Sequence, residues 1–478
     1  MKYLIGIDIG TSGTKTVKFD VDSNIIKSKT VEYSISQPQN GWAEQDPELW
    51  VKAVFETLEF VGLDNVAGIG LSGQMHGLVM LDENNEVIRP AILWCDQRTT
   101  AECEEITEAI GRERLVEITA SPAMTGFTLS KIMWIKKHEP ENFKKCRHIL
   151  LPKDYIRFKL TGEFATDFSD ASGTQLLNIK DRCWSDELLD KFGINKDFLP
   201  KLYESCEITG YYKDIPVAAG GGDNACTAVG CGTIKSGRAF TTIGTSGVVY
   251  AHTNAPVIDN AGRTHTFCSA VPNEWHIMGV TQAAGLSLKW FRENFAKDLS
   301  YADIDEIVKK VSVGSEKLLY LPYLMGERTP HLDSNARGVF FGISAIHKRE
   351  HFLRSIMEGV SYSLRDCLEV LKENSVSVQD MTIIGGGSKS SVWKEMLSSV
   401  FNLPVKTSNC SDSAALGAAI LAGVGVGIYE SIDEACESIV KYSSLLKGNN
   451  SEDYDKFYVL YRKLYFSLKN DFRELIRL

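Results

Sequence analysis

The 478-residue chain lacks a long apolar run and lacks paired cysteines. Its most apolar window, residues 414–428, is short and rich in glycine, whereas a membrane-spanning helix needs about 20 apolar residues. The eleven cysteines include no Cys-x-x-Cys pair, which predicts free thiols in a reducing cytoplasm. The opening run MKYLIGIDIG has a single lysine and is interrupted by Asp8, unlike a signal peptide. We therefore expect a globular cytoplasmic protein without a membrane partner.

An excess of positive charge is also lacking. The sequence has 52 Lys and Arg against 62 Asp and Glu, a formal net charge of −10. Such a surface does not attract nucleic acid or anionic lipid over a long range, so we expect no nucleic-acid partner. The P-loop pattern GxxxxGK[ST] is absent as well. An anionic ligand would therefore be held by local backbone dipoles and a few cations.

Short apolar strands alternate with helices along the chain, which predicts an α/β fold. In the first half, the patterns predict a helix that begins at Asp46-Pro47-Glu48 and strands at 4–9, 14–21, 25–34 and 66–73. In the second half, a strand from 381 runs into a glycine turn, and helices are predicted at 391–402, at 413–423 and at the end of the chain. The length predicts two domains, or three.

The tetrapeptide GTSG occurs twice, at 10–13 and at 244–247, each time directly after a short apolar strand. Glycine permits close backbone approach, and successive backbone N–H groups in such a turn form a concave anion site. Thr11, Ser12, Thr245 and Ser246 add hydroxyl donors. Two such loops facing one another could hold a polyphosphate from both sides; alternatively, each is only a tight turn. The repeat suggests two related halves around a shared cleft.

Two aspartates lie at positions where a phosphate-binding site could use a carboxylate, for a metal ion or as a base. Asp8 lies at the end of the first strand, just before the first loop, where it could hold Mg²⁺ through water or simply cap the turn. Asp223 follows three glycines in AAGGGDNA. In a cramped, partly dry site it would be a credible general base, and the alternative is the N-cap of the helix that follows.

Motifs along nearly the whole chain resemble the FGGY carbohydrate kinase family. They are GIDIGTSGTK (6–15), WAEQDPELW (42–50), GLSGQMHG (70–77), RPAILWCDQR (89–98), LLPKDYIRFKLTGEFATDFSDASGT (150–174), AGGGDNA (219–225), IGTSG (243–247), LPYLMGERTPH (321–331), EGVSYSLRD (358–366) and IIGGGSKS (383–390). The resemblance implies two actin-like (ribonuclease-H-like) ATPase domains flanking a catalytic cleft. We expect an N-terminal domain at 1–238 on the sugar side and a C-terminal domain at 239–478 on the nucleotide side. The final helix, about 452–478, could pack on the N-terminal domain, and a homodimer is a family-level expectation.

For the sugar side, the resemblance implies that Asp223 is the catalytic base. The implied sugar contacts are Gln74, Met75, His76, Gly77, Asp223 and Asn224. Trp94 and Asp96 are weaker candidates, because Trp94 could simply belong to the core, as could His76. Arg328 could shape the second phosphate site or form an ion pair with Glu327.

For the nucleotide side, the resemblance implies ATP with Mg²⁺ and places the metal at Asp8. The implied phosphate contacts are Thr11, Ser12, Gly13 and Lys15 in the first loop and Gly244, Thr245 and Ser246 in the second. Gly386, Gly387 and Ser388 would border the adenine and ribose, although a GGG run could also be a bare turn. Ala414, Ala415 and Gly417 would let the base lie flat, but small residues at helical spacing also serve close helix packing.

The implied reaction is ATP-dependent phosphorylation of D-xylulose to D-xylulose 5-phosphate. The sugar motifs contain no pair of Arg or Lys, which argues against a carboxylate sugar such as gluconate, although Arg98 lies nearby. The alternatives are another ketopentose or polyol, or a non-catalytic sugar sensor of the same fold. Against the sensor, Asp223 is present.

Overall fold

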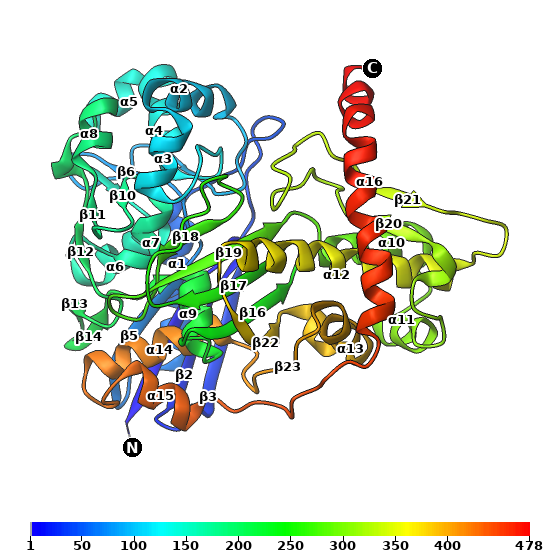
Figure 1. Cartoon of the computed structure of the whole chain (residues 1–478). Coiled ribbons are helices and arrows are strands. Elements are labelled where there is room, and N and C mark those ends of the chain that lie inside the picture. Colours follow the sequence, from blue (N-terminus) through cyan, green and yellow to red (C-terminus); the bar gives the residue numbers. More distant parts are fainter. Residues whose placement is uncertain (1) are drawn as a thin grey trace.

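The computed structural model describes residues 2–478 and consists of two halves, each built on one twisted sheet (Figure 1). The strands of the first sheet, in spatial order, are β13 (Ile208–Tyr212), β14 (Ile215–Ala218), β5 (Val66–Gly73), β1 (Tyr3–Ile9), β2 (Gly13–Asp20) and β3 (Ile25–Glu32), with β15 (Gly221–Gly222) beside the end of β5. Those of the second sheet are β18 (His265–Cys268), β19 (Trp275–Thr281), β17 (Gly247–Thr253), β16 (Gly237–Ile243), β22 (Val378–Ile384) and β23 (Val405–Lys406).

The two sheets repeat one arrangement of strands. In the first, β1 and β2 form an antiparallel hairpin and β5 runs parallel to β1. In the second, β16 and β17 form the hairpin and β22 runs parallel to β16. The two GTSG segments are the turns of these equivalent hairpins. The predicted α/β class with two related halves is confirmed.

The first sheet is covered by helices on both faces. α1 (Pro47–Val61) begins where the sequence predicts, because the Asp46 side chain accepts a hydrogen bond from the Glu48 backbone N–H. α14 (Ser413–Gly425) lies against the other face, although it belongs to the second half by sequence. A Cβ on Gly6 would lie 1.8 Å from the carbonyl oxygen of Ala415, so the sheet and α14 pack backbone to backbone. The small residues of α14 therefore serve close packing.

The second sheet is crossed by α12 (Arg349–Glu373), and the final helix α16 (Ser451–Arg477) crosses α12 in turn (Figure 1). Buried tyrosines hold α16 there: Tyr454 accepts a hydrogen bond from Arg354, and Tyr458 donates one to Asp366. The final helix thus packs on the C-terminal half, which corrects the expectation that it could pack on the N-terminal domain. An amphipathic pattern shows that a helix has a face to bury but not which partner receives it.

The remaining elements are shorter or peripheral. The other α-helices are α2 (Thr100–Ile110), α3 (Arg112–Thr119), α4 (Thr128–His138), α5 (Pro140–Lys145), α6 (Pro152–Thr161), α7 (Phe168–Ala171), α8 (Asp186–Phe192), α9 (Asp223–Gly230), α10 (Gly285–Phe295), α11 (Tyr301–Val308), α13 (Ser391–Phe401) and α15 (Ile432–Ile439). Short strand pairs are β4 (Glu44–Gln45) with β7 (Ala91–Ile92), β6 (Val79–Leu81) with β8 (His148–Leu150), β9 (Ala165–Asp167) with β12 (Lys201–Tyr203), β10 (Leu177–Asn178) with β11 (Cys183–Trp184), and β20 (Leu319–Leu321) with β21 (Val339–Phe341). Single 3₁₀ turns occur at Ser172–Thr174, Lys196–Phe198, Ser315–Lys317 and Gly386–Lys389.

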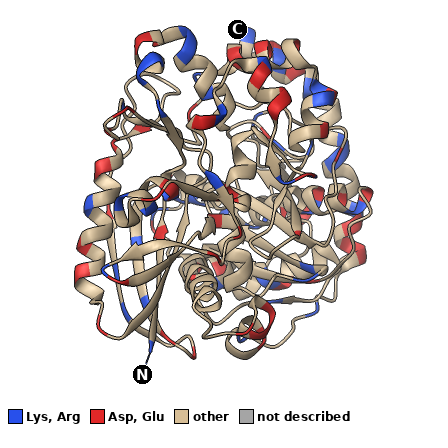
Figure 2. Ribbon diagram, turned by 90° about the vertical axis from the view of Figure 1, so that its left-hand side faces the viewer, with Lys and Arg blue, Asp and Glu red and all other residues tan. Residues whose placement is uncertain are grey.

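Lys and Arg are interspersed with Asp and Glu along the outer helices (Figure 2). All eleven cysteines are free thiols, as predicted. Within residues 2–478, no helix combines the length and the apolar character needed to cross a membrane.

Candidate active site

A cavity of about 240 Å³ lies where the two halves meet. The first half contributes Met75 and His76, which follow β5, and Asp223 and Asn224, which begin α9. The second half contributes Ser246, His265 and Arg328. Four of the six predicted sugar contacts therefore line one cavity, together with a hydroxyl from the second GTSG turn.

Asp223 has the properties of a general base in this cavity. Its Oδ1 accepts hydrogen bonds from the Asn224 backbone N–H at 2.6 Å and from the Asn224 amide at 3.0 Å. Its Oδ2 has no protein hydrogen-bond partner within the described chain. Burial and the nearby negative charge of Asp8 raise the pKa of Asp223 to about 7. A carboxylate poised near neutral pH can both take up and release a proton during turnover.

Asp8 is the last residue but one of β1, and it lies close enough to Asp223 for their charges to interact. Its Oδ1 accepts a hydrogen bond from the Ser72 hydroxyl at 2.9 Å, and burial raises its pKa. Mg²⁺ usually takes one or two carboxylates, keeps several waters and binds substrate phosphates. Asp8, with one oxygen not engaged by Ser72, fits such a site. Residues 2–478 contain no cluster of three or more His, Cys, Asp or Glu side chains that would form an all-protein metal site.

His76 is held in one orientation and one tautomer. It has a left-handed φ of 66°, and Lys131 fixes its backbone by donating to the carbonyl oxygens of His76 and Gly126, each at 2.8 Å. Its Nδ1 lies 2.8 Å from the carbonyl oxygen of Gly173. Because a carbonyl can only accept, Nδ1 carries the proton and Nε2 is an acceptor. Burial lowers the pKa of His76 well below its ordinary value, so the ring is neutral.

Two predicted sugar contacts, Gln74 and Gly77, are not among the residues that line the cavity. The Gln74 amide is directed at the Gly10 carbonyl and at Gln45. A Cβ on Gly77 would lie 2.6 Å from the ring of Pro152, so this glycine permits close packing. Short motifs do not show which of four consecutive residues faces a ligand, because that depends on the local turn.

Trp94 joins the cavity to the first GTSG turn. It lines the cavity, and its indole N–H donates to the Thr11 hydroxyl at 2.9 Å. Asp96 lies behind the wall, where it accepts from the Ala43 backbone N–H and pairs with Arg98 at 2.7 Å. Arg98 is thereby engaged in a buried ion pair.

The first turn is rigid at its base, because the Gly10 N–H donates to the Gly13 carbonyl and Tyr33 N–H donates to the Ser12 carbonyl. Lys15, predicted at the phosphates, forms an ion pair with Asp412, the residue before α14. The first turn is therefore tied to the second half of the chain.

The second turn packs against the start of α10. The Thr245 carbonyl accepts from the N–H groups of Ala284 and Leu286, and the Gly244 carbonyl accepts from Gly285. Ser246 faces the cavity.

The glycine turn predicted at the nucleotide lies next to the second GTSG turn. A Cβ on Gly387 would lie 2.6 Å from the Ile243 side chain, which immediately precedes Gly244. Gly386 and Ser388 belong to the same 3₁₀ turn; Gly386 is exposed and Ser388 is half-buried. Ala415 is buried against β1, where it fills the helix–sheet contact.

Two further residues of the cavity are functional candidates. The sequence patterns assign Arg328 only a role in shaping a loop or forming an ion pair, and they do not indicate His265. Arg328 is the single Lys or Arg among the described residues that line the cavity. Glu327 accepts from the Arg328 backbone, Thr281 and Ser363, so it shapes the loop without pairing with the guanidinium. Burial and the Arg328 charge lower the pKa of His265 to about 3, so its ring is neutral.

Two family profiles match this chain. Residues 3–230 match the FGGY family of carbohydrate kinases, N-terminal domain, and residues 239–426 match the C-terminal domain of the same family. The chain belongs to the FGGY family of carbohydrate kinases. It is an ATP-dependent carbohydrate kinase, and the resemblance seen in the motifs is confirmed.

Relatives of this FGGY kinase include the xylulose kinase of Bacillus subtilis (strain 168), which is 41% identical over 98% of both chains. The ligand-bound xylulose kinase from Lactobacillus acidophilus is 28% identical, with a TM-score of 0.95 and coverage of 99% of this chain and 100% of that one. The gluconate kinase from Lactobacillus acidophilus is also 28% identical, with a TM-score of 0.94 and coverage of 99% of both chains. Similarity of fold therefore does not by itself discriminate between the two sugars.

Proposed function

We propose that the protein phosphorylates D-xylulose with ATP, giving D-xylulose 5-phosphate and ADP. The observation that carries the proposal is Asp223, whose Oδ2 lacks a protein partner among the described residues in a cavity of largely neutral polar groups. The 41% identity to a xylulose kinase over nearly the whole chain supports the choice of sugar. The family resemblance and the free cysteines support a cytoplasmic location.

Asp223 acts as the general base. It removes the proton from the terminal hydroxyl of the sugar as that oxygen attacks the γ-phosphorus of ATP. The bond from this phosphorus to the bridging oxygen of ADP breaks, and ADP leaves with the electron pair. General-base assistance contributes about 10²–10⁴ in rate, so alignment and charge neutralisation supply the rest.

The two GTSG turns hold the polyphosphate. From the first half, the backbone N–H groups of Thr11, Ser12 and Gly13 and the hydroxyls of Thr11 and Ser12 approach the phosphates. From the second half, the backbone of Gly244 and the backbone and hydroxyl groups of Thr245 and Ser246 approach them. Asp8 would hold Mg²⁺, which would supply neutralisation of the phosphate charge. Arg328, as the cation of the cavity wall, contacts the phosphoryl group during transfer.

A neutral ketopentose matches the rest of the cavity. His76 Nε2 accepts a hydrogen bond from a sugar hydroxyl, because Nδ1 is engaged by Gly173. The Asn224 amide donates to another hydroxyl, and Met75 offers an apolar surface. A carboxylate sugar would need a cationic partner, for which Arg328 is the candidate.

The two halves close on the sugar and exclude water before transfer. We therefore expect ATP hydrolysis without sugar to be slow. A basal ATPase as fast as the sugar-driven rate would contradict this gating.

The test is a coupled ADP-release assay of the wild type and Asp223→Ala with ATP and Mg²⁺. The sugar panel is D-xylulose, L-ribulose, D-ribulose, L-xylulose, glycerol and gluconate. We expect the highest kcat/KM with D-xylulose and loss of turnover in Asp223→Ala. A different best sugar would change only the substrate assignment. ADP release that no sugar accelerates would favour a nucleotide-driven sensor.

A further inference from the structure

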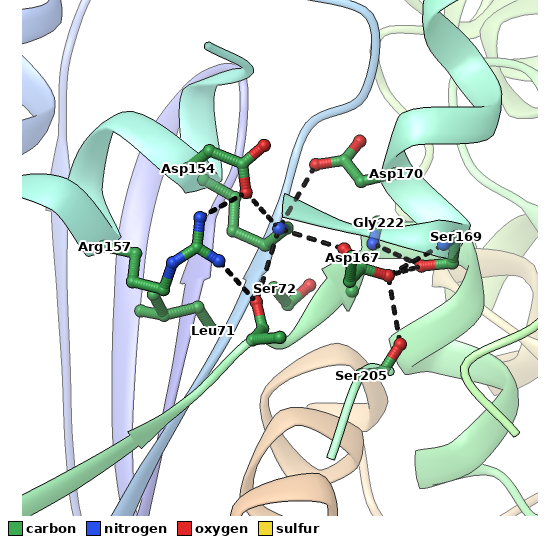
Figure 3. Close-up of polar contacts among 12 residues, drawn as sticks. Leu71, Ser72, Asp154, Arg157, Asp167, Ser169, Asp170, Ser205 and Gly222 are labelled. Carbon is green, nitrogen blue, oxygen red and sulfur yellow. Dashed lines mark hydrogen bonds and ion pairs between the residues drawn. The ribbon is translucent and has the colours of Figure 1, made fainter. Parts of the chain in front are cut away.

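A fully buried network of charges lies next to Gly222, the residue that precedes Asp223 (Figure 3). Lys153 and Asp154 come from α6, and Asp167 and Asp170 come from β9 and α7. The Lys153 ammonium lies 2.6 Å from Asp154 and 3.0 Å from Asp167, and Asp170 follows at 3.7 Å. Arg157, one turn further along α6, pairs with Asp154 at 3.1 Å.

This network combines two cations with three carboxyl groups, and such an arrangement costs free energy to bury. Burial alone would lower the pKa of Lys153, but the three neighbouring carboxyl groups raise it above its ordinary value. Neither oxygen of Asp170 has a hydrogen-bond partner within residues 2–478, and burial raises its pKa well above the ordinary range. A protonated Asp170 leaves two cations facing two carboxylates. Packed apolar residues would stabilise this position at least as well, so stability alone does not explain the network.

The network contacts both ends of the segment 219–222, which directly precedes Asp223 and is called the glycine segment below. At its N-terminal end, the Ala219 carbonyl accepts hydrogen bonds from Lys153 at 3.4 Å and from Arg157 at 3.5 Å. At its C-terminal end, the Gly222 backbone N–H donates a hydrogen bond to the Ser169 hydroxyl oxygen at 3.1 Å. Ser169 can accept there because its own proton is donated to Asp167 at 2.5 Å.

The glycine segment has little room to adjust by itself. Gly220 has a left-handed φ of 75°, and a Cβ there would lie 2.0 Å from the Leu71 carbonyl. A Cβ on Gly222 would lie 2.9 Å from Met75, which lines the cavity. Residues 221–222 form β15 beside the end of β5. A small displacement of Gly222 would therefore move both Asp223 and Met75, which line the cavity.

We propose that Ser169 is a positioning residue for the reaction: anchored by Asp167 and Lys153, it holds the Gly222 N–H and so fixes Asp223 at its place in the cavity. The inference rests on the proposed function for its catalytic consequence. Asp223 is the group that touches the substrate, and Ser169 acts only through the backbone.

The chain offers a matched pair of variants for the test. Ser169 and Ser205 each donate one hydroxyl hydrogen bond to the same Oδ2 of Asp167, at 2.5 and 3.0 Å, and both are buried. Only the Ser169 hydroxyl also accepts from Gly222. Ser169→Ala and Ser205→Ala therefore remove equivalent support from Asp167, but only the first removes the anchor of the glycine segment.

We expect Ser169→Ala to lower kcat at saturating D-xylulose and ATP by about tenfold or more, since a misplacement of about 1 Å costs about 10²-fold. Its KM for D-xylulose should change far less than kcat, because the sugar contacts remain. Amide hydrogen exchange of the peptide spanning 217–226 should become faster. Ser205→Ala should show neither change in kcat nor faster exchange in this peptide, at a similar loss of Tm.

Equal kcat values and equal exchange in the two variants would overturn the positioning role and leave the proposed function intact. A wild type that phosphorylates no sugar would instead remove the proposed function. In that case the exchange comparison still decides whether Ser169 holds the glycine segment.

Discussion

Asp223→Asn should make the ligand-free protein more stable at alkaline pH while it abolishes most of the activity. The substitution keeps the shape of the side chain and removes its charge. Asp223 is half-buried, and burial together with Asp8 raises its pKa from 3.8 to about 7. Ionisation of Asp223 therefore requires more free energy in the folded protein than in the unfolded chain.

The sign and the magnitude follow from that difference. Between about pH 4 and pH 7 the unfolded chain is ionised at this position and the folded protein is protonated, so stability falls as pH rises through this window. A pKa about 3 above its ordinary value corresponds to about 4 kcal/mol. Because the side chain faces the cavity, solvent screening reduces the expected effect to about 2 kcal/mol. In a domain of roughly 200 residues that corresponds to a Tm difference of about 4 °C or more.

The assay is the Tm of the wild type and Asp223→Asn at pH 5 and pH 8, without ATP or Mg²⁺. Asp471→Asn, an exposed change on α16, is the control and should leave Tm unchanged at both pH values. We expect the advantage of Asp223→Asn to be clearly larger at pH 8 than at pH 5. The kcat of the variant should be about 10²–10⁴ lower, and wild-type kcat/KM should be about tenfold lower at pH 6 than on its alkaline plateau. An Asn variant that is equally destabilised at both pH values would refute the account of Asp223 as a half-buried carboxylate whose ionisation destabilises the folded protein.

Gly173→Ala places a Cβ 2.4 Å from His76 Nδ1, so we expect steady-state kinetics to show a KM for D-xylulose about tenfold higher or more; an unchanged KM would argue against His76 as a sugar ligand. Arg328→Met should lower kcat by about 10²-fold or more in the ADP-release assay, whereas Arg337→Met, on the same loop, should not; equal rates for the two would exclude the phosphoryl contact. Chelation by EDTA should stop turnover and added Mg²⁺ should restore it, with a higher Mg²⁺ requirement in Asp8→Asn; activity that survives chelation would contradict the metal site.

Most local elements could be predicted from the sequence, because their causes lie within a few residues. Asp46 and Pro47 mark the start of α1 since they satisfy the first backbone groups of a helix, and the structure contains that cap. Each GTSG segment follows an apolar strand and forms the turn of a hairpin. The site residues Asp223 and His76 stood in short motifs with few chemical interpretations, and both line the cavity.

Other parts of the site could not be predicted, because they depend on residues that are distant in sequence. Gly173 fixes the tautomer of His76 across 97 positions. His265 stands in no motif that indicated a ligand, and only the meeting of the two halves brings it to the cavity wall. Gln74 lies next to Met75 and yet does not line the cavity, since its amide is directed at Gln45 and at the Gly10 carbonyl.

The order of apolar strands and glycine turns thus determined the α/β class and the duplicated hairpins, and a carboxylate in a glycine-rich motif led to the proposal of Asp223 as the base. Each of these depends on local geometry and residue chemistry. The tertiary structure decided which faces were buried against which partners. It placed α14 on the first sheet, α16 on the second half, and Ser169 behind Gly222. These packing arrangements depend on shape and charge complementarity between surfaces that meet only when the chain is folded. A pattern of residues along the sequence therefore does not predict them.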